Sequence, residues 1–390
     1  MSSIPSGYKQ TEVGVIPEDW EPTPLSDTCT LHNGRAYGLH EWERSGVPVI
    51  RLQNLTGGED YYFSTLPLAE QKYCDYGDLL YMWSATFGPR IWRGGRAIYH
   101  YHIWKIGPKK TRASSEFLYY KLLEITDEKK ARATNGGTML HVTKASMEAT
   151  RVALPPLPEQ RAIAAALSDV DALLAKLDQF IAKKRDLKQA AMQRLLTGQT
   201  RLPGFSGAWV VKRLGDVADC LDNVRVPLNE SERNRMKGDY PYCGANGVLD
   251  FVNDFVIDDD IILMAEDGGY FDEYSFRPIA YRMIGKCWVN NHAHVLKAKA
   301  GYDQGLLFYS LVHKNILSYL ASGTRAKLNK SEMNKIEVNL PLDPLEQTVI
   351  ATVLFDMDAE LAALEARRDK TCALKQGMMQ ELLTGRIRLV

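Results

Sequence analysis

One stretch of this sequence decides the fold: EQRAIAAALSDVDALLAKLDQFIAKKRDLKQAAMQRLLTG, from Glu159 to Gly198. A second copy runs without a gap from Glu346 to Gly385, each position 187 residues further along (346 − 159). About half of the aligned positions are identical. Because self-similarity at a fixed offset marks a repeated architecture, the chain is interpreted as a tandem duplication.

Both copies have the hydrophobic periodicity of a long helix. Their apolar residues recur in steps of four and three, and this forms a narrow seam that needs a partner helix. The seam residues are Ile163, Leu167, Val170, Leu174 and Leu177 in the first copy and Ile350, Leu354, Met357, Leu361 and Leu364 in the second. Two such helices in one chain pack most simply on each other. A generic coiled coil between two chains has the same pattern and stays open as an alternative.

The boundaries of both helices carry ordinary start and stop signals. Pro158 suits a first helical turn, where no backbone N–H is needed, and Glu159 faces the positive end of the helix dipole. Gly198 and Gly385 stand where a left-handed residue ends a helix. Each helix is therefore expected to be about 40 residues, or roughly 60 Å, long.

The segments before the two helices are paired more loosely. Trp20 and Leu25 correspond to Trp209 and Leu214 at an offset of 189 (209 − 20). Both segments contain β-rich runs and shorter helical stretches, so each half is predicted to hold a mixed α/β globule of about 150 residues. The strand-like runs are 48–52, 78–82, 98–106, 261–264 and 287–296, and the helical stretches are 116–125 and 304–317. Similar helices with dissimilar globules predict one scaffold that presents two different binding surfaces.

Length and composition set the remaining limits. The chain has 390 residues, and at roughly 100–200 residues per domain this length predicts two to three domains. Apolar residues make up 45% of it, enough to build cores. No run approaches the length of a membrane span, no signal peptide begins the sequence, and the six cysteines are scattered. These features predict a cytoplasmic protein with free thiols.

The positive charge is unevenly distributed, although the formal net charge is +0. No acidic residue occurs between Asp78 and Glu116, and Asp303 is the only one between Tyr274 and Ser331. Clustered Lys and Arg in a neutral protein indicate a phosphate-binding face, and Arg can also read guanine. A solvated face balanced by acids from elsewhere in the fold is the alternative. The predicted DNA-binding residues are Arg90, Arg93, Arg96, Lys109, Lys110, His141, Lys144, Arg277, Arg282, Arg325, Lys327 and Lys330.

Two short turns and two histidine pairs are also repeated. Glycine lets backbone N–H groups approach an anion, although an ordinary tight turn explains the turns more simply. The histidine pairs are expected on one face of a strand, without further ligands at suitable spacing, so no metal is predicted. The turns are Gly137-Thr138 and Gly323-Thr324, and the histidine pairs are His100/His102 and His292/His294.

Motifs for catalysis are missing from the sequence. It contains no Gly-x-x-x-x-Gly-Lys-Ser/Thr loop, no Gly-x-Ser-x-Gly elbow and no His-Glu-x-x-His. It also lacks the Asn/Asp-Pro-Pro-aromatic segment of amino-methyltransferases. We therefore predict no catalytic residue in this chain.

The two repeated helices and the segments before them resemble the specificity subunit of type I restriction–modification systems, and the resemblance extends over essentially the whole chain. The segments from Leu157 to Gly198 and from Glu346 to Arg386 look like the two connector regions of that family. The resemblance implies an α+β fold with two mixed α/β target-recognition domains, two long antiparallel coiled-coil helices and a pseudo-twofold internal repeat. The implied domains are 1–153 (first recognition domain), 154–200 (first connector helix), 201–340 (second recognition domain) and 341–390 (second connector helix).

The same resemblance implies a mechanism without catalysis by this chain. Each recognition domain reads one half of a split DNA site, and the helices set the spacing and dock two methyltransferase subunits. Those partners bring S-adenosylmethionine, while motor–nuclease subunits bring ATP and magnesium. Three alternatives remain: a subunit for a fused methyltransferase–nuclease, a coiled-coil scaffold that binds no DNA, and a self-contained nuclease or methyltransferase.

Overall fold

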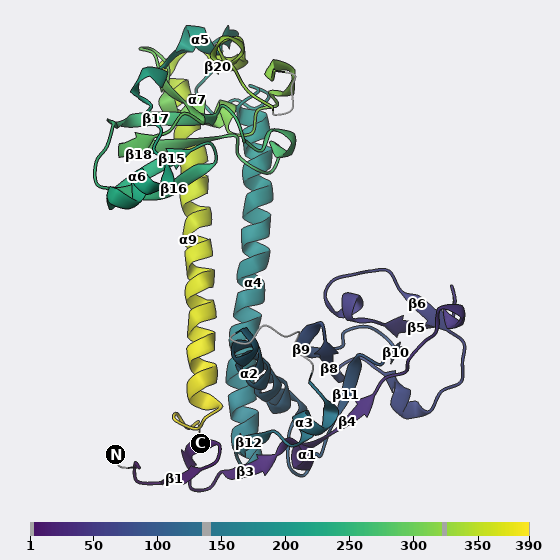
Figure 1. Ribbon diagram of the computed structural model, residues 1–390. Coiled ribbons are helices and arrows are strands. Elements are labelled where there is room, and N and C mark those ends of the chain that lie inside the picture. Colours follow the sequence, from purple (N-terminus) through teal and green to yellow (C-terminus); the bar gives the residue numbers. More distant parts are fainter. Residues whose placement is uncertain (1–3, 135–141, 322–325, 390) are drawn as a thin grey trace. The chain divides into compact units, whose positions relative to one another are not determined.

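The computed structural model describes residues 4–134, 142–321 and 326–389. The chain divides into two units, each with one mixed α/β head. Unit 1 consists of the chain up to Leu177 together with the segment from Arg367 onward, and unit 2 is Asp178–Ala366. The predicted α+β class with two heads and two long helices is confirmed (Figure 1).

The two long helices are α4 (Leu157–Leu195) and α9 (Pro344–Leu382), each of 39 residues. Each unit contains one half of each helix, and within a unit the two halves lie side by side and run in opposite directions (Figure 1). The seam residues of both copies are buried or half-buried. Each seam therefore packs against the other long helix within its own unit, Ile163 and Leu167 with Leu382 and Ile350 and Leu354 with Leu195.

Both helices end in the repeated Thr-Gly, and both glycines are required there. Gly198 has φ +73° and Gly385 has φ +74°, the left-handed region that disfavours other residues. A Cβ on Gly198 would lie 3.1 Å from the Trp209 ring, and one on Gly385 would lie 2.6 Å from Pro17. The glycines let each helix end closely against its head.

Two four-stranded sheets form the head of unit 1, with orders β4-β11-β8-β9 and β6-β5-β10-β7. Two strand pairs, β1–β2 and β3–β12, complete it. The strands are β1 (Tyr8–Thr11), β2 (Gly14–Pro17), β3 (Glu21–Pro24), β4 (Cys29–Asn33), β5 (Val47–Ile50), β6 (Tyr62–Ser64), β7 (Tyr73–Cys74), β8 (Leu79–Ser84), β9 (Thr86–Ile91), β10 (Ala97–Tyr99), β11 (Ile103–Pro108) and β12 (Arg151–Leu154). Its helices are α1 (Leu25–Thr28), α2 (Ser115–Thr134) and α3 (Lys144–Glu148).

One six-stranded sheet forms the head of unit 2, with the order β14-β19-β17-β18-β15-β16. The pair β13–β20 lies beside the helices, as β3–β12 does in unit 1. The strands are β13 (Trp209–Arg213), β14 (Ala218–Cys220), β15 (Lys237–Gly244), β16 (Gly247–Val252), β17 (Ile257–Ala265), β18 (Ala280–Val289), β19 (Ala293–Ala298) and β20 (Glu337–Pro341). Its helices are α5 (Leu214–Val217), α6 (Glu230–Arg235), α7 (Gln304–Leu311) and α8 (Lys330–Met333).

Two predicted strands are each divided by a bend, which the sequence pattern did not show. The run 98–106 forms β10 and β11, which belong to different sheets, and the run 287–296 forms β18 and β19. His100–His102 lie at the first bend and Asn290–His292 at the second. The bends are short and include the exposed residues Tyr101, Asn291 and His292, while the strands on either side are largely buried. Three residues are too few to separate two apolar runs by periodicity, so the sequence pattern merged the strands.

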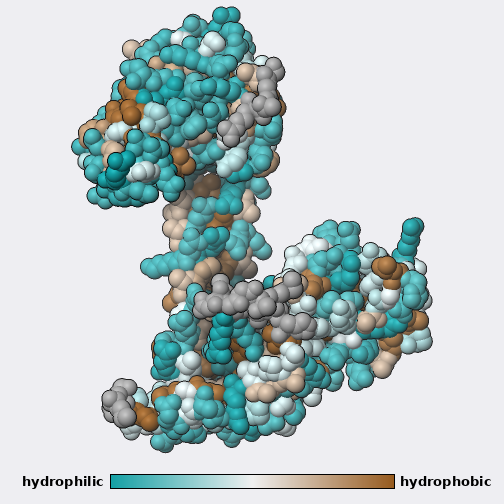
Figure 2. All heavy atoms as spheres, in the orientation of Figure 1, coloured by the Kyte–Doolittle hydropathy of each residue, from teal (hydrophilic) through white to brown (hydrophobic). Residues whose placement is uncertain are grey.

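The main core of each head extends onto the long helices of its own unit. In unit 1, Trp20, Phe117 and Leu167 are fully buried in one cluster that also contains Leu383. In unit 2 the corresponding cluster joins head residues to α4 and α9. Figure 2 shows that hydrophilic residues cover most of the visible face of the unit 2 head. Each head is therefore packed as one body with its helix halves.

Candidate nucleic-acid interface

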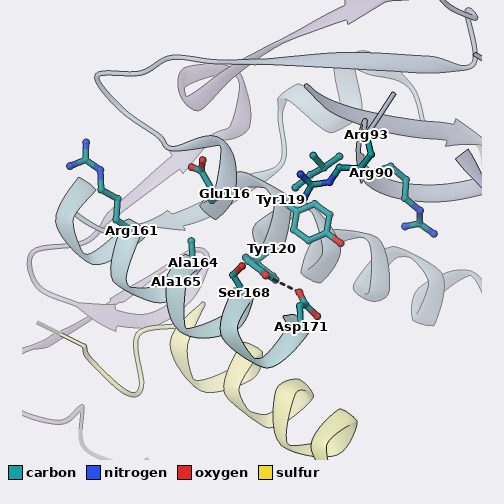
Figure 3. Close-up of a pocket in the computed structure, with 11 residues that line it drawn as sticks. Arg90, Arg93, Glu116, Tyr119, Tyr120, Arg161, Ala164, Ala165, Ser168 and Asp171 are labelled. Carbon is teal, nitrogen blue, oxygen red and sulfur yellow. Dashed lines mark hydrogen bonds between the residues drawn. The ribbon is translucent and has the colours of Figure 1, made fainter. Parts of the chain in front are cut away.

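Two of the predicted arginines of the first head, Arg90 and Arg93, lie beside the β4-β11-β8-β9 sheet. Arg90 is exposed on β9, and Arg93 is exposed in the turn that follows. Together with Arg161 of α4 they line a cavity of about 700 Å³ between β9, α2 and α4 (Figure 3). Arg93 donates to the Tyr76 hydroxyl at 3.3 Å, and no carboxylate of the described residues forms an ion pair with it. Arg96 differs, because Glu70 holds it at 2.6 Å.

The remaining predictions for the first head have mixed outcomes. Lys109 and Lys110 are exposed after β11, and Lys144 begins α3 at 3.6 Å from Glu148. His141 and the Gly137-Thr138 turn lie outside the described residues. The aromatic residues of the same window divide: most lie in the core, while Trp83 and Tyr101 reach the surface.

In the second head the predicted cations are largely balanced by acids within the head. Arg282 donates to Asp260 through Nε at 2.7 Å, and Lys327 lies 2.9 Å from Glu266. Arg277 lies 3.2 Å from Glu273 and stacks on Tyr270, and the Lys330 ammonium donates to the Cys220 carbonyl oxygen at 3.5 Å. Asp260 and Glu266 lie outside the acid-free window, on or just after the neighbouring strand β17. Gly323, Thr324 and Arg325 lie outside the described residues.

Two arginines that the sequence reasoning missed lie among aromatic rings of the first head. Arg35 lies 4.2 Å from the Tyr37 ring centre, and Arg51 lies 4.3 Å from that of Tyr62. Neither residue belongs to a basic run, so a search for clustered charge passes over them. The only sequence signal is the density of aromatic residues around them.

A buried ion pair fastens each head to the ends of the helices. In unit 1 the fully buried Glu159 carboxylate accepts hydrogen bonds from Arg388 Nε at 2.6 Å and from Trp20 Nε1 at 2.9 Å. In unit 2 the equivalent Glu346 accepts two bonds from Arg201, both of 2.6 Å. We call these groups the Glu159 clamp and the Glu346 clamp.

The glutamine after each glutamate has a parallel role. Gln160 accepts from the Ser114 backbone N–H at 3.0 Å and donates to the Pro155 carbonyl at 2.9 Å. Gln347 accepts from the Asp303 N–H at 2.8 Å and donates to the Pro341 carbonyl at 2.8 Å. The repeated Glu-Gln pair thus satisfies polar groups where head and helix meet.

A second repeated contact ties a head helix to both long helices. In unit 1 the Tyr120 hydroxyl of α2 donates to Asp171 of α4 at 2.8 Å (Figure 3). Lys375 of α9 lies 2.5 Å from the same carboxylate. Burial and the Asp171 carboxylate raise the pKa of Tyr120, so its hydroxyl stays protonated as a donor. The equivalent residues of unit 2 are Tyr309, Asp358 and Lys188.

The repeated histidines do not share a strand face. His100 and His102 lie at the first bend, while His294 lies on β19. Its Nδ1 lies 2.7 Å from Asp222 and its Nε2 lies 2.8 Å from the Leu328 carbonyl oxygen, so the ring is held from both sides. Burial lowers the pKa of His294, but the contacts with Asp222, Cys220 and the Leu328 carbonyl together outweigh it and raise the pKa to about 9.

The same place contains a group of potential metal ligands that the sequence spacing did not reveal. Cys220, Asp222 and His294 have ligand atoms within 4.8 Å of one another, because β14 pairs with β19. Arg225 lies 3.2 Å from Asp222 and 2.5 Å from Glu266. Arg225 and the protonated His294 balance the charges of Asp222 and Glu266. We therefore interpret the cluster as a network of ion pairs.

The duplicated heads, each clamped to an antiparallel helix pair, define the class as a two-headed recognition subunit. The chain belongs to the family described as type I restriction modification DNA specificity domain, which matches residues 17–184 and 207–371. The two matches cover one head each, so both heads are DNA-recognition domains of a type I specificity subunit.

Relatives agree with this assignment. The chain is 35% identical over 160 residues to a Haemophilus influenzae protein named as a type I restriction enzyme specificity subunit, covering 40% of this chain and 39% of that protein. It is 23% identical over 411 residues to the type I restriction enzyme MjaVIII specificity subunit of Methanocaldococcus jannaschii, covering 96% and 94%. The chain thus spans less than half of the first relative and nearly all of the second.

Solved structures show the same fold. The type I restriction–modification S subunit from M. genitalium matches with a TM-score of 0.61 and 16% identity, covering 93% of this chain and 96% of that one.

Within the described residues, no helix is both long and apolar enough to cross a membrane.

Proposed function

We propose that this chain reads a split, asymmetric site in double-stranded DNA and directs adenine methylation to it. One observation carries the proposal: the Glu159 and Glu346 clamps repeat the same arginine–glutamate ion pair beneath heads that differ in their sheets. Repetition of the fastening keeps two heads on a common scaffold, and divergence of the surfaces gives two different half-sites. The chain has no catalytic role in this proposal.

The partners follow from the same proposal. Two methyltransferase subunits dock on the helices and supply S-adenosylmethionine, and motor–nuclease subunits that use ATP and magnesium join for restriction. A single fused methyltransferase–nuclease is the alternative partner. The complex works in the cytoplasm, where it meets DNA. Because the chain has a formal net charge of +0, we infer that the methyltransferase subunits complete a positive DNA channel.

Mapping of adenine methylation tests the proposal directly. A host genome is sequenced by a single-molecule method, with and without this gene beside its methyltransferase gene. We expect a split, asymmetric motif that appears only when the gene is present. An active methyltransferase whose methylation pattern ignores the gene would contradict the proposal and favour the scaffold that binds no DNA.

Replacement of Arg93 by alanine is expected to weaken DNA binding. If its guanidinium reads a base, the variant loses about 1–3 kcal/mol; if it contacts phosphate, the slope of log K against log salt falls by about one. Affinities measured over a salt series separate the two results. Arg151→Ala is the matched control, because that arginine of the same head is paired with Glu12 and belongs to no predicted site. Identical curves for wild type and Arg93→Ala would remove Arg93 from the interface.

Lengthening both helices is expected to lengthen the spacer between half-sites. One heptad inserted after Lys183, and another after its repeat equivalent Lys370, preserves the pairing of Asp171 with Lys375 and of Lys188 with Asp358. Seven residues add about 10 Å, which corresponds to roughly three base pairs at 3.4 Å each. Methylation mapping measures the spacer. A variant that methylates with the original spacer would contradict the idea that the helices act as a ruler.

A further inference from the structure

Aromatic and arginine side chains alternate in one cluster on the β6-β5-β10-β7 side of the first head. Arg51, directly after β5, lies 4.3 Å from the ring centre of Tyr62 and 5.8 Å from that of Trp42. The rings of Trp42 and Tyr37 stack with their centres 4.9 Å apart, and the Arg35 guanidinium lies 4.2 Å from the Tyr37 ring centre. These five residues are called the Arg51 cluster.

The hydrogen bonding of the Arg51 cluster is incomplete. In the described part of the chain, four buried side-chain polar atoms have no hydrogen-bond partner, and three of them are Arg35 Nη1, the Tyr37 hydroxyl and Arg51 Nε. Because buried polar groups are nearly always paired, such a concentration requires an explanation. One explanation is that these polar atoms form their hydrogen bonds only when a partner binds to this surface.

The two arginines of the cluster differ in their charge balance. Arg35 forms an ion pair with Glu41, whereas no carboxylate of the described residues pairs with Arg51. The neighbouring His100 is neutral, since burial, His102 and Arg51 together lower its pKa to about 4. Arg51 is therefore a half-buried cation without a counter-charge, and two aromatic rings limit its motion.

We propose that Arg51 reads a guanine in the half-site bound by the first head. The inference rests on the proposed function and names one residue that determines its specificity. A guanidinium has the planar fork that pairs with guanine O6 and N7, and its support on rings reduces the freedom lost on binding. Tyr62 is a positioning residue here, because it holds the guanidinium and contacts no base itself.

The second head lacks a side chain at the equivalent place. In the first head the His100 N–H donates to the Ile50 carbonyl at 2.9 Å, and in the second the Asn290 N–H donates to the Cys243 carbonyl at 3.0 Å. Both bonds follow a parallel strand pair, β5–β10 or β15–β18. The residue after Ile50 is Arg51 and the residue after Cys243 is Gly244. The guanine contact is therefore restricted to one half-site.

Methylation mapping with variant chains provides the first test, using the complex with its methyltransferase. Arg51→Ala and Arg51→Lys are expected to relax the motif at one guanine by about five- to 150-fold, the range for one bidentate contact. The other half-site stays unchanged. Arg151→Ala removes an arginine of the same head that is paired with Glu12 and belongs to no predicted site, so it is the control and keeps the full motif.

Binding to modified duplexes provides a second test, whose first step uses only the wild-type complex. Duplexes that contain the mapped site carry 7-deazaguanine, which lacks N7, at one guanine at a time. We expect one position to weaken binding of the wild-type complex, and the same substitution to have no further effect on Arg51→Ala. Tyr62→Leu, which keeps the arginine without its support, is expected to give an intermediate loss.

The outcomes separate this inference from the proposed function. A wild-type complex that yields no split motif overturns the proposed function. A split motif that Arg51→Ala and Arg51→Lys leave intact, or one without a guanine in either half, overturns only the role of Arg51. Equal thermal midpoints of wild type and Arg51→Ala show that a change of motif does not come from unfolding.

Discussion

Replacement of Arg201 by alanine is expected to destabilise the second unit by about 3–5 kcal/mol, the cost of leaving a buried charge unpaired. The Glu346 carboxylate is fully buried, and both of its oxygens accept from Arg201 at 2.6 Å. No other side chain of the described residues donates to it. Unfolding by urea, followed by circular dichroism, measures the loss.

The Glu159 clamp provides an internal comparison. In Arg388→Ala the Glu159 carboxylate keeps its hydrogen bond from Trp20 Nε1, whereas Trp209 Nε1 has no partner in unit 2. The loss in Arg388→Ala should therefore be smaller by about 1 kcal/mol, the contribution of one hydrogen bond.

Two further variants identify the buried charge as the cause. Arg185→Ala removes an exposed ion pair with Glu365 and should cost less than about 1 kcal/mol. Adding Glu346→Gln to Arg201→Ala removes the unpaired charge and should restore part of the stability. An Arg201→Ala chain as stable as Arg185→Ala would contradict the assigned role of the clamp.

The parts of this fold that were predictable depend on local patterns. The seam residues and the terminal glycines lie close together in sequence, so periodicity and end signals located both helices. Identity within the repeat also marked Asp171 and Lys188 with their equivalents, but it gave no reason for them. The structure explains Asp171 and its equivalent Asp358, because each accepts a hydrogen bond from a tyrosine of its own head, Tyr120 or Tyr309. These tyrosines lie about 50 residues away in the sequence, so hydrophobic periodicity could not predict the contacts.

The candidate interface was less predictable because electrostatic partners come from other strands. Arg282 lies in an acid-free window, yet Asp260 faces it across the β17–β18 pair. Lys327, just before α8, pairs with Glu266, which directly follows β17. Arg51 is the opposite case. It does not belong to a run of basic residues, so a search for clustered charge did not find it, and only the fold brings Tyr62 and Trp42 beside it.

Replacement of His294 by leucine is expected to abolish a distinctive loss of stability at alkaline pH. The imidazolium lies between the Asp222 carboxylate and the Leu328 carbonyl oxygen, and its side chain is 2% exposed. The other charged groups of this network are Glu266, 3.7 Å from the ring, and Arg225 and Lys327, which pair with that glutamate. The Cys220 thiol also faces the ring.

The direction of the pH effect follows from the raised pKa. Folding raises the pKa of His294 from 6.5 to about 9, so the folded chain keeps a proton that the unfolded chain releases. The stabilisation is complete below pH 6.5 and is lost as the pH rises through about 9. At 1.36 kcal/mol per pH unit, the loss amounts to roughly 3 kcal/mol.

The partner carboxylate limits the same stabilisation on the acid side. Contacts with His294 and the Val295 N–H lower the pKa of Asp222 to about 2 although burial opposes them, so its contribution disappears as the pH falls through that value. Wild-type stability should be greatest between about pH 4 and 6.5. The His294→Leu chain should be less stable there, and its stability should change little between pH 6.5 and 9. His40→Gln, at an exposed site of the other head, is the control and should retain the wild-type slope.

Loss of this proton should also affect recognition by one head only. Leu328, whose carbonyl oxygen His294 holds, is buried and stands in the sequence between Lys327 and Lys330, two predicted DNA contacts. A neutral imidazole keeps one N–H, and the Asp222 carboxylate holds that proton on Nδ1, so deprotonation removes the Nε2 hydrogen bond to the Leu328 carbonyl oxygen. Discrimination at the second half-site should therefore weaken between pH 7 and 9 while the first half-site is unchanged. Binding to duplexes with one altered half-site at a time measures this difference. Equal weakening at both half-sites would show that the whole chain, rather than this segment, responds to pH.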